Sequence, residues 1–177
     1  KAATLLVRPH ETVPKHGHPL PTRRLLIALD GSKESEAMLA TAVELGEAVG
    51  AKFTLLQVID FAAYYGADPA EVAACYPEVA PMQELQTKAA AYLEELAEPL
   101  RRRGLHVQTR AVIHSDPAAM ILQQAHDLHC DLIALESRGE AGLARLMLGS
   151  VEDAIVRYGK TAVLTHSAAA GAPGAKH

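Results

Sequence analysis

The sequence predicts an α/β domain built on a doubly wound, parallel, five-stranded sheet with helices on both faces. Short apolar segments, typical of buried strands, alternate with longer segments whose apolar residues recur every three or four positions. This alternation indicates strand–helix–strand units, which form parallel sheets through right-handed crossovers. The composition agrees, because 4% aromatic residues and no Trp in 177 residues suit one helix-covered domain better than a β-sandwich.

The predicted elements follow one another from Arg24 onward. The expected strands are Arg24–Leu29, Lys52–Ile59, Leu105–Ile113, Leu132–Leu135 and Thr161–Thr165. The expected helices are Lys33–Val49, Met82–Arg103, Ala118–Leu128 and Val151–Tyr158. Ser32 and Asp116 each precede a helix and are suited to cap it, and Pro117 fits a first helical turn. The segment Asp60–Pro81 is expected to be an irregular surface excursion.

Both ends of the chain are expected to lie outside the main domain, which we assign to residues 23–167. Residues 1–22 are expected to hold a short strand and a Pro- and His-rich linker, and residues 168–177 a disordered tail. Lys1–Val7 resembles Lys160–His166 in composition and in its initial lysine, which hints at an internal repeat. The first segment is then either the last strand of a preceding domain or a fortuitous apolar tail. We expect Thr161–Thr165 to be an edge strand, and Thr4–Val7 to pair with such a strand in this chain or in a partner.

The segment Asp131–Ser150 carries the clearest functional pattern. A buried strand leads into a polar loop that contains glycine, and Gly149 and Ser150 then precede the last predicted helix. Ser150 and Asp153 have the spacing of a capping box. Because backbone N–H groups and the positive end of a helix point the same way in this arrangement, it is a potential anion site.

This segment resembles the nucleotide loop of universal stress proteins, whose ATP-binding members carry G-x2-G-x9-G-[S/T] after the fourth strand. Gly139, Gly149 and Ser150 fit this pattern, but Glu136 stands at the first glycine position. The resemblance extends from about Arg23 to His166. It implies a Rossmann-like fold, similar to that of adenine-nucleotide alpha-hydrolases, with strand order 3-2-1-4-5 counted from Arg24. It also implies a homodimer, or pairing with a tandem domain of the same family, through the last edge strand.

The resemblance further implies a nucleotide pocket where the strand order reverses, between the first and fourth strands. The positions that it nominates are Ala28, Asp30, Val58, Gly139, Gly149, Ser150 and Val151, with Ser137 and Arg138 as adjacent candidates. Each also has a purely structural explanation. Asp30 can bond the backbone of the Gly31–Ser32 turn, the glycines can serve turn geometry alone, and Ser150 can be only a cap.

Glu136 raises the main functional question, because a carboxylate brings bulk and negative charge towards a polyphosphate. Either the pocket no longer takes ATP, or a Mg²⁺ ion bridges Glu136, Asp30 and the phosphates. Mg²⁺ favours a few carboxylates together with phosphate oxygens, so the second outcome is chemically sensible. We favour the first.

Charge and cysteine content argue against several other functions. The net charge of −4 gives no broad attraction to nucleic acid or to anionic membranes, and no apolar run approaches a membrane span. Cys75 and Cys130 are far apart, which suggests reduced thiols in a cytoplasmic protein. His126, His129 and Cys130 are close in sequence but fall short of the usual zinc ligand set, so we expect no metal site there.

Three functions remain open. We favour a regulatory binding module with a pocket for ATP or another adenine nucleotide, altered at Glu136. An enzyme that hydrolyses ATP slowly is the second hypothesis, although no catalytic residues stand out and no P-loop lysine lies in the glycine loop. A dimerisation domain that binds no nucleotide is the third.

Overall fold

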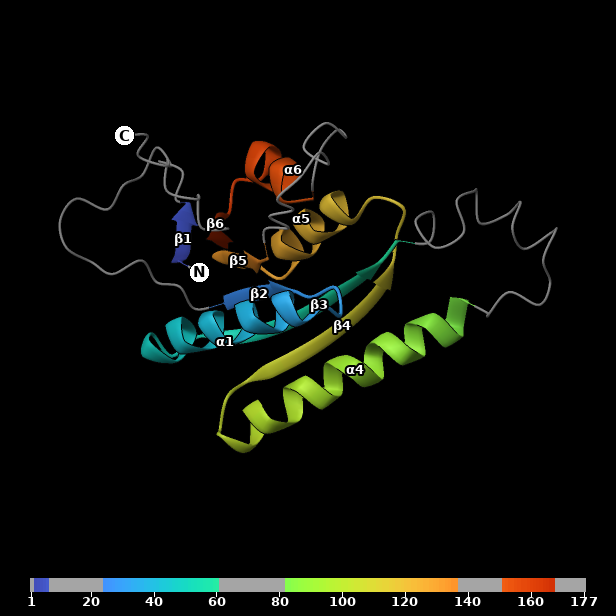
Figure 1. Cartoon of the computed structure of the whole chain (residues 1–177), viewed down its shortest axis with the longest axis horizontal. Helices are drawn as coiled ribbons and strands as arrows, with labels where there is room; N and C mark the ends of the chain where they lie inside the picture. Colours follow the sequence, from blue (N-terminus) through green and yellow to red (C-terminus); the bar gives the residue numbers. More distant parts are fainter. Residues whose placement is uncertain (1, 7–23, 61–81, 137–150, 168–177) are drawn as a thin grey trace, which may run out of the picture.

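The computed structural model describes residues 2–6, 24–60, 82–136 and 151–167 (Figure 1). Predictions for four segments therefore lie outside the described residues. These segments are the linker Pro9–Pro21, the excursion after Asp60, the glycine loop at residues 137–150 and the tail from residue 168.

The described strands form one sheet. They are β1 (Ala2–Leu6), β2 (Arg24–Ala28), β3 (Lys52–Ile59), β4 (Val107–Ile113), β5 (Leu132–Leu135) and β6 (Ala162–Ser167). Their order is β1-β6-β5-β2-β3-β4, and the strands from β2 to β6 are parallel. The doubly wound parallel sheet and the strand order expected from β2 onward are confirmed. The prediction of five strands was wrong, because the sheet has six.

The sixth strand, β1, pairs antiparallel with β6, with Ala2 opposite Ser167 and Leu6 opposite Val163. The outer edge of β6 carries backbone N–H and C=O groups that need partners, and β1 supplies them. The segment predicted as the edge strand, Thr161–Thr165, is therefore interior, and β1 forms the edge instead. The expected pairing of the N-terminal segment with the last strand is confirmed within the chain for Thr4–Leu6.

Four described helices cover the two faces of the sheet. They are α1 (Lys33–Ala48), α4 (Met82–Arg102), α5 (Pro117–Asp127) and α6 (Val151–Tyr158). The predicted caps are confirmed, since Ser32 Oγ accepts from the Ser35 N–H at 3.2 Å and Asp116 Oδ1 accepts from the Ala119 N–H at 3.0 Å. None of the described helices combines the length and the apolar character that crossing a membrane requires.

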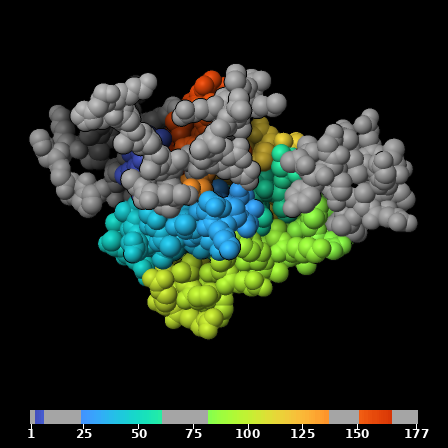
Figure 2. Space-filling model, viewed as in Figure 1, coloured from blue at the N-terminus to red at the C-terminus, as the bar shows by residue number. Residues whose placement is uncertain are grey.

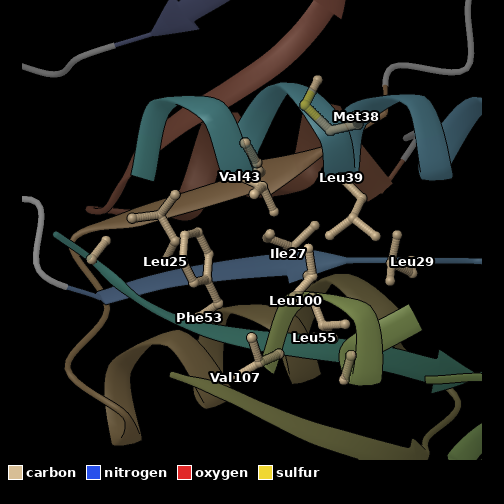
Figure 3. Packing of buried hydrophobic residues seen from close by; sticks show 14 of the residues in the cluster. Leu25, Ile27, Leu29, Met38, Leu39, Val43, Phe53, Leu55, Leu100 and Val107 are labelled. Atoms are coloured by element: carbon tan, nitrogen blue, oxygen red, sulfur yellow. The ribbon is translucent and has the colours of Figure 1, made fainter. Parts of the chain in front are cut away.

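The helices α1 and α4 cover one face of the sheet and form the larger core with it. Buried side chains of β2 and β3, among them Leu25, Phe53 and Leu55, pack against Met38 of α1 and Leu100 of α4 (Figure 3). In the space-filling view the atoms of α1 and α4 lie against one another (Figure 2). This core fixes the positions of the end of β2 and the start of α1. The turn between them forms one part of the candidate site.

The helices α5 and α6 cover the opposite face. Ile121 of α5 and Ile155 of α6 pack against Leu26, Leu56 and Ile133 of the sheet, and all five side chains are buried. The apolar strand residues thus alternate between the two cores, as expected for a sheet with helices on both faces.

Candidate functional site

The turn between β2 and α1 places Asp30 at the carboxyl end of β2. Asp30 Oδ1 accepts hydrogen bonds from the Ser32 backbone N–H at 3.0 Å and from the Ser32 hydroxyl at 2.6 Å. Gly31, between them, has a φ of +83°, a conformation that favours glycine. The sequence left two roles open for Asp30, one in this turn and one in binding nucleotide. The two hydrogen bonds show that Asp30 has the structural role in the turn. Its side chain is also exposed at the edge of the sheet.

Ser32 connects this turn to the first turn of α1. Besides capping the helix, Ser32 offers its carbonyl oxygen to the Ser35 hydroxyl at 2.9 Å. Ser35 is 2% exposed, so this pair of bonds lies at the boundary of the core. The backbone at the end of β2 is thus held in place by bonds within the chain, which lowers the ordering cost of binding a ligand there.

Glu136 directly follows β5, which lies beside β2. The parallel register pairs Leu25 with Leu132 and Ile27 with Ala134, so both strands end at the same edge of the sheet. The strand order also reverses here, because the chain continues from β2 to β3 on one side and from β5 to β6 on the other. Ligands of open α/β sheets bind beyond the carboxyl ends of strands at such a reversal. Asp30 and Glu136 each bring a carboxylate to this edge.

Ala28 and Val58 provide apolar surface near this edge. Ala28 is the last residue of β2, and Val58 is the second-last residue of the neighbouring strand β3, opposite Val112 of β4. Both side chains are half-buried and pack against the core beneath α5 and α6. An apolar side chain in this position suits contact with a flat ring, which is the role that the resemblance implies for Val58.

Val151 begins α6 and is 36% exposed. The next two residues are acidic: Glu152 Oε1 accepts from the Thr165 hydroxyl at 3.1 Å, and Asp153 pairs with Arg157 at 3.2 Å. Carboxylates in a first helical turn stabilise the positive helix end, and these two bring negative charge to the start of α6.

Five nominated residues, Ser137, Arg138, Gly139, Gly149 and Ser150, lie outside the described residues. Their roles, and the capping box expected at Ser150, stay predictions.

The sequence reasoning missed a polar contact between α1 and α4. The Tyr92 hydroxyl donates to Glu36 Oε1 at 3.3 Å. Burial, and then the nearby Glu36 carboxylate, raise the pKa of Tyr92 to about 12. Tyr92 therefore stays protonated at neutral pH and acts as a hydrogen-bond donor between the two helices.

Gln57 lies close to the β2–α1 turn, and the sequence analysis did not single it out either. Its Oε1 is buried and accepts no hydrogen bond from any residue that the structure describes. A Cβ added to Gly31 would lie 3.8 Å from Gln57 Nε2, which places the amide beside the β2–α1 turn. A sequence signal existed, because Gln57 interrupts the apolar run of β3. Such a buried oxygen is suited to accept a hydrogen bond from a donor outside the described residues.

The side chains around His126 show no ligand set. His126 Nδ1 lies 3.3 Å from Asp127 Oδ1, and His129 Nδ1 lies 3.1 Å from the Asp127 carbonyl oxygen. Cys130 is half-buried, and desolvation raises the pKa of its thiol to about 11. Among the residues that the structure describes, no three His, Cys, Asp or Glu side chains gather as a metal site would require.

A doubly wound parallel sheet with polar side chains where its strand order reverses defines a class of α/β domains that bind ligands at the carboxyl edge. Within that class, residues 21–165 match the model of the Universal stress protein family. The match spans most of the chain, so the chain belongs to this family.

Individual relatives agree with this assignment. A putative universal stress protein of Staphylococcus haemolyticus is 30% identical over 147 residues, which are 80% of this chain and 82% of the relative. The crystal structure of a universal stress protein from Archaeoglobus fulgidus has a TM-score of 0.62 and 19% identity, and the match covers 93% of this chain and 49% of that one. The crystal structure of a universal stress protein in complex with cAMP has a TM-score of 0.58 and 22% identity, with coverage of 82% and 96%. These two likenesses show the fold.

Proposed function

We propose that this chain is a regulatory binding module whose ligand, an adenine nucleotide, binds at the carboxyl edge of β2, β3 and β5. The observation that carries the proposal is the position of Asp30 and Glu136 at the ends of neighbouring strands, where the strand order reverses. Membership of the Universal stress protein family supports it, as does the family neighbour that was solved in complex with cAMP. Ala28 and Val58 provide the apolar surface for the adenine ring.

The proposed phosphate end of the pocket is formed by Ser137, Arg138, Gly139, Gly149, Ser150 and Val151. Arg138 can pair with a phosphate, and the backbone around the two glycines can approach it closely. These assignments rest on the family pattern in the sequence.

Glu136 reduces the affinity for ATP in this proposal, or makes that affinity depend on Mg²⁺. At about 4 Å, one pair of like charges in a partly solvated site costs about 1–4 kcal/mol. A loss of about 1.4 kcal/mol is already tenfold in affinity. Asp30, Glu152 and Asp153 add further carboxylates near the same edge. A nucleotide with a single phosphodiester, such as cAMP, meets less repulsion than ATP does, and Mg²⁺ offsets the repulsion for ATP.

Two alternatives are tested together with this function. A dimerisation domain without nucleotide is the first alternative, in which β1, the outer strand of the sheet, pairs with another chain. Slow ATP hydrolysis has no specific support among the described side chains.

We propose a cytoplasmic location, where the half-buried free thiol of Cys130 stays reduced.

Calorimetry with ATP, Mg·ATP and cAMP tests the proposal on the wild type, Glu136→Gln and Glu136→Gly. The glutamine variant removes the charge and keeps the bulk, whereas the glycine variant removes both. We expect metal-free ATP to bind at least about tenfold more tightly to both variants, with a gain that shrinks at high salt. Glu95→Gln, at an exposed position on α4, is the matched control and should leave binding unchanged.

Each other outcome has a definite meaning. If the wild type binds Mg·ATP well and both variants lose that binding, Glu136 is a metal ligand rather than an obstruction. If ADP accumulates with the wild type, the enzyme hypothesis replaces the module. If no nucleotide binds to any form, the nucleotide proposal is wrong and the dimerisation domain is favoured.

A further inference from the structure

His114 directly follows β4 at the carboxyl edge of the sheet, one strand beyond Val58. Its backbone N–H donates to the Ile59 carbonyl oxygen at 3.1 Å, so the ladder between β3 and β4 continues to this residue. Because side chains alternate between the faces of a strand, His114 lies on the same face as Val112, which packs against the core beneath α5 and α6. Ala28 and Val58, the apolar surface proposed for the adenine ring, lie on that face too.

One ring nitrogen of His114 is held by the start of α5, where the chain continues from β4 (Figure 1). The Asp116 N–H donates to Nδ1 at 3.0 Å, and Nδ1 also lies 2.9 Å from the Asp116 carbonyl oxygen. That carbonyl already accepts the helical bond from the Met120 N–H at 3.1 Å, whereas Nδ1 is the acceptor that the described residues offer to the Asp116 N–H. Nδ1 therefore acts as the acceptor, and the proton of the neutral ring is on Nε2.

The second ring nitrogen, Nε2, is thus a hydrogen-bond donor. His114 is half-buried, and none of the residues that the structure describes accepts a bond from Nε2. A polar group that is partly desolvated in this way gains free energy when it finds a partner. Its position at the carboxyl edge, on the face of Val58, suits a partner that belongs to the ligand.

The spacing of the strands indicates which part of a nucleotide reaches His114. Neighbouring strands are about 4.8 Å apart, so a ring that rests on Val58 of β3 lies about one strand spacing from the end of β4. The proposed phosphate end lies in the other direction, beyond β2 at the end of β5. The edge of the base that faces β4 is therefore the edge farthest from the phosphates, which is the Watson–Crick edge. In adenine the N1 atom on this edge is an acceptor, whereas in guanine N1 carries a hydrogen.

We propose that His114 determines the base specificity of the site, with Nε2–H donating a hydrogen bond to N1 of adenine. This inference rests on the proposed nucleotide function and adds the residue that selects the base. Guanine would place its N1–H against the Nε2–H, which leaves both donors without an acceptor. A site that is built around such a bond rejects the base that lacks the acceptor.

Calorimetry with cAMP, cGMP and the 1-deaza analogue of cAMP, in which carbon replaces N1, tests the proposal on the full chain. The variant His114→Asn keeps a side-chain oxygen that can accept from the Asp116 N–H, but its side chain ends short of the Nε2 position. We expect the wild type to bind cAMP about three- to tenfold more tightly than the 1-deaza analogue, as one neutral hydrogen bond implies, and cGMP more weakly than cAMP. His114→Asn should bind cAMP and the 1-deaza analogue equally, with a smaller preference over cGMP.

Two further variants separate the base contact from a structural effect. His114→Gln, whose longer amide restores an N–H donor, should recover part of the preference for cAMP over the 1-deaza analogue. His106→Asn, at an exposed position just before the amino end of β4, is the matched control and should bind all three ligands as the wild type does.

The outcomes distinguish this inference from the nucleotide proposal. If the wild type binds cAMP and the 1-deaza analogue equally, or if His114→Asn keeps the wild-type preference, the assignment of His114 is wrong while the nucleotide proposal stands. The comparison on the wild type needs no substitution, so it decides the question even if the variants do not fold. If the wild type binds none of the three ligands, the nucleotide proposal fails and the assignment of His114 fails with it.

Discussion

The packing of Phe53 under α1 leads to a quantitative prediction for Gly46→Ala. Gly46 lies in the last turn of α1 and is buried, and a Cβ added there would lie 2.4 Å from Phe53 Cε1 and 2.5 Å from Cζ. Real Cβ atoms do not approach a ring so closely, so α1 or the ring must move. Phe53 is 1% exposed and is surrounded by Leu25, Val43 and other core residues, which leaves it little room (Figure 3).

Two effects of opposite sign decide the outcome. Overpacking a core costs about 1–3 kcal/mol. Replacing Gly by Ala inside a helix stabilises it by about 1 kcal/mol. Because the clash involves a buried ring rather than the end of a flexible side chain, we expect overpacking to win, with a net loss of up to about 2 kcal/mol.

Urea denaturation of four chains measures this balance: the wild type, Gly46→Ala, Phe53→Leu and the double variant. The smaller Leu gives the added methyl group room, so the double variant should lose less stability than the sum of the two single losses. Ala40→Gly, at an exposed position of the same helix, measures the helix propensity alone. A Gly46→Ala variant more stable than the wild type would refute the reasoning.

Two further predictions concern the candidate site and the pH dependence of stability. Ser32→Ala removes the cap of α1 and the hydroxyl bond to Asp30, so we expect a loss of about 1 kcal/mol in urea denaturation and weaker nucleotide binding. Ser32→Gly should cost only a few tenths of a kcal/mol, because glycine is itself a favourable N-cap residue. Equal losses of stability for the two variants would contradict the cap assignment. Hydrogen bonds from Arg101 and then Thr109 lower the pKa of Glu94 from 4.5 to about 2, so its contribution to stability is present above pH 4.5 and is lost as the pH falls towards 2. Glu94→Gln should flatten acid denaturation in that window while its neighbour Glu95→Gln should not, and a Glu94 carboxyl that titrates near 4.5 by NMR would contradict the assigned bonds.

Much of the fold was predictable because apolar periodicity is local. The bounds predicted for Lys52–Ile59, Leu132–Leu135 and Val151–Tyr158 agree with β3, β5 and α6. The strand order came from the family resemblance, since periodicity does not say which strands are neighbours. The predicted number of strands in the sheet was wrong, because a short apolar segment such as Ala2–Leu6 can pair within its own chain or with another chain. The sequence pattern alone does not distinguish these two pairings.

The candidate site was predictable only where it follows strand ends. Asp30 and Glu136 could be placed because parallel strands end at one edge of the sheet. The contact between Tyr92 and Glu36 could not be predicted from the sequence, because it joins two helices that are far apart along the chain. Gln57 could have been noticed as a polar residue inside an apolar strand, but its place beside Gly31 depends on the β2–α1 turn.

The most direct test of the central claim is to map nucleotide binding on the backbone amides of the intact chain by NMR. Titration with cAMP, and with ATP in the presence and absence of Mg²⁺, should shift the amide signals of Ala28–Ser32, Val58 and Glu136. Signals from the middle of α4 and from β1 should stay in place. Shifts that gather elsewhere, for example around Gln86 and Ala111 between α4 and β4, or no shifts with any nucleotide, would contradict the account.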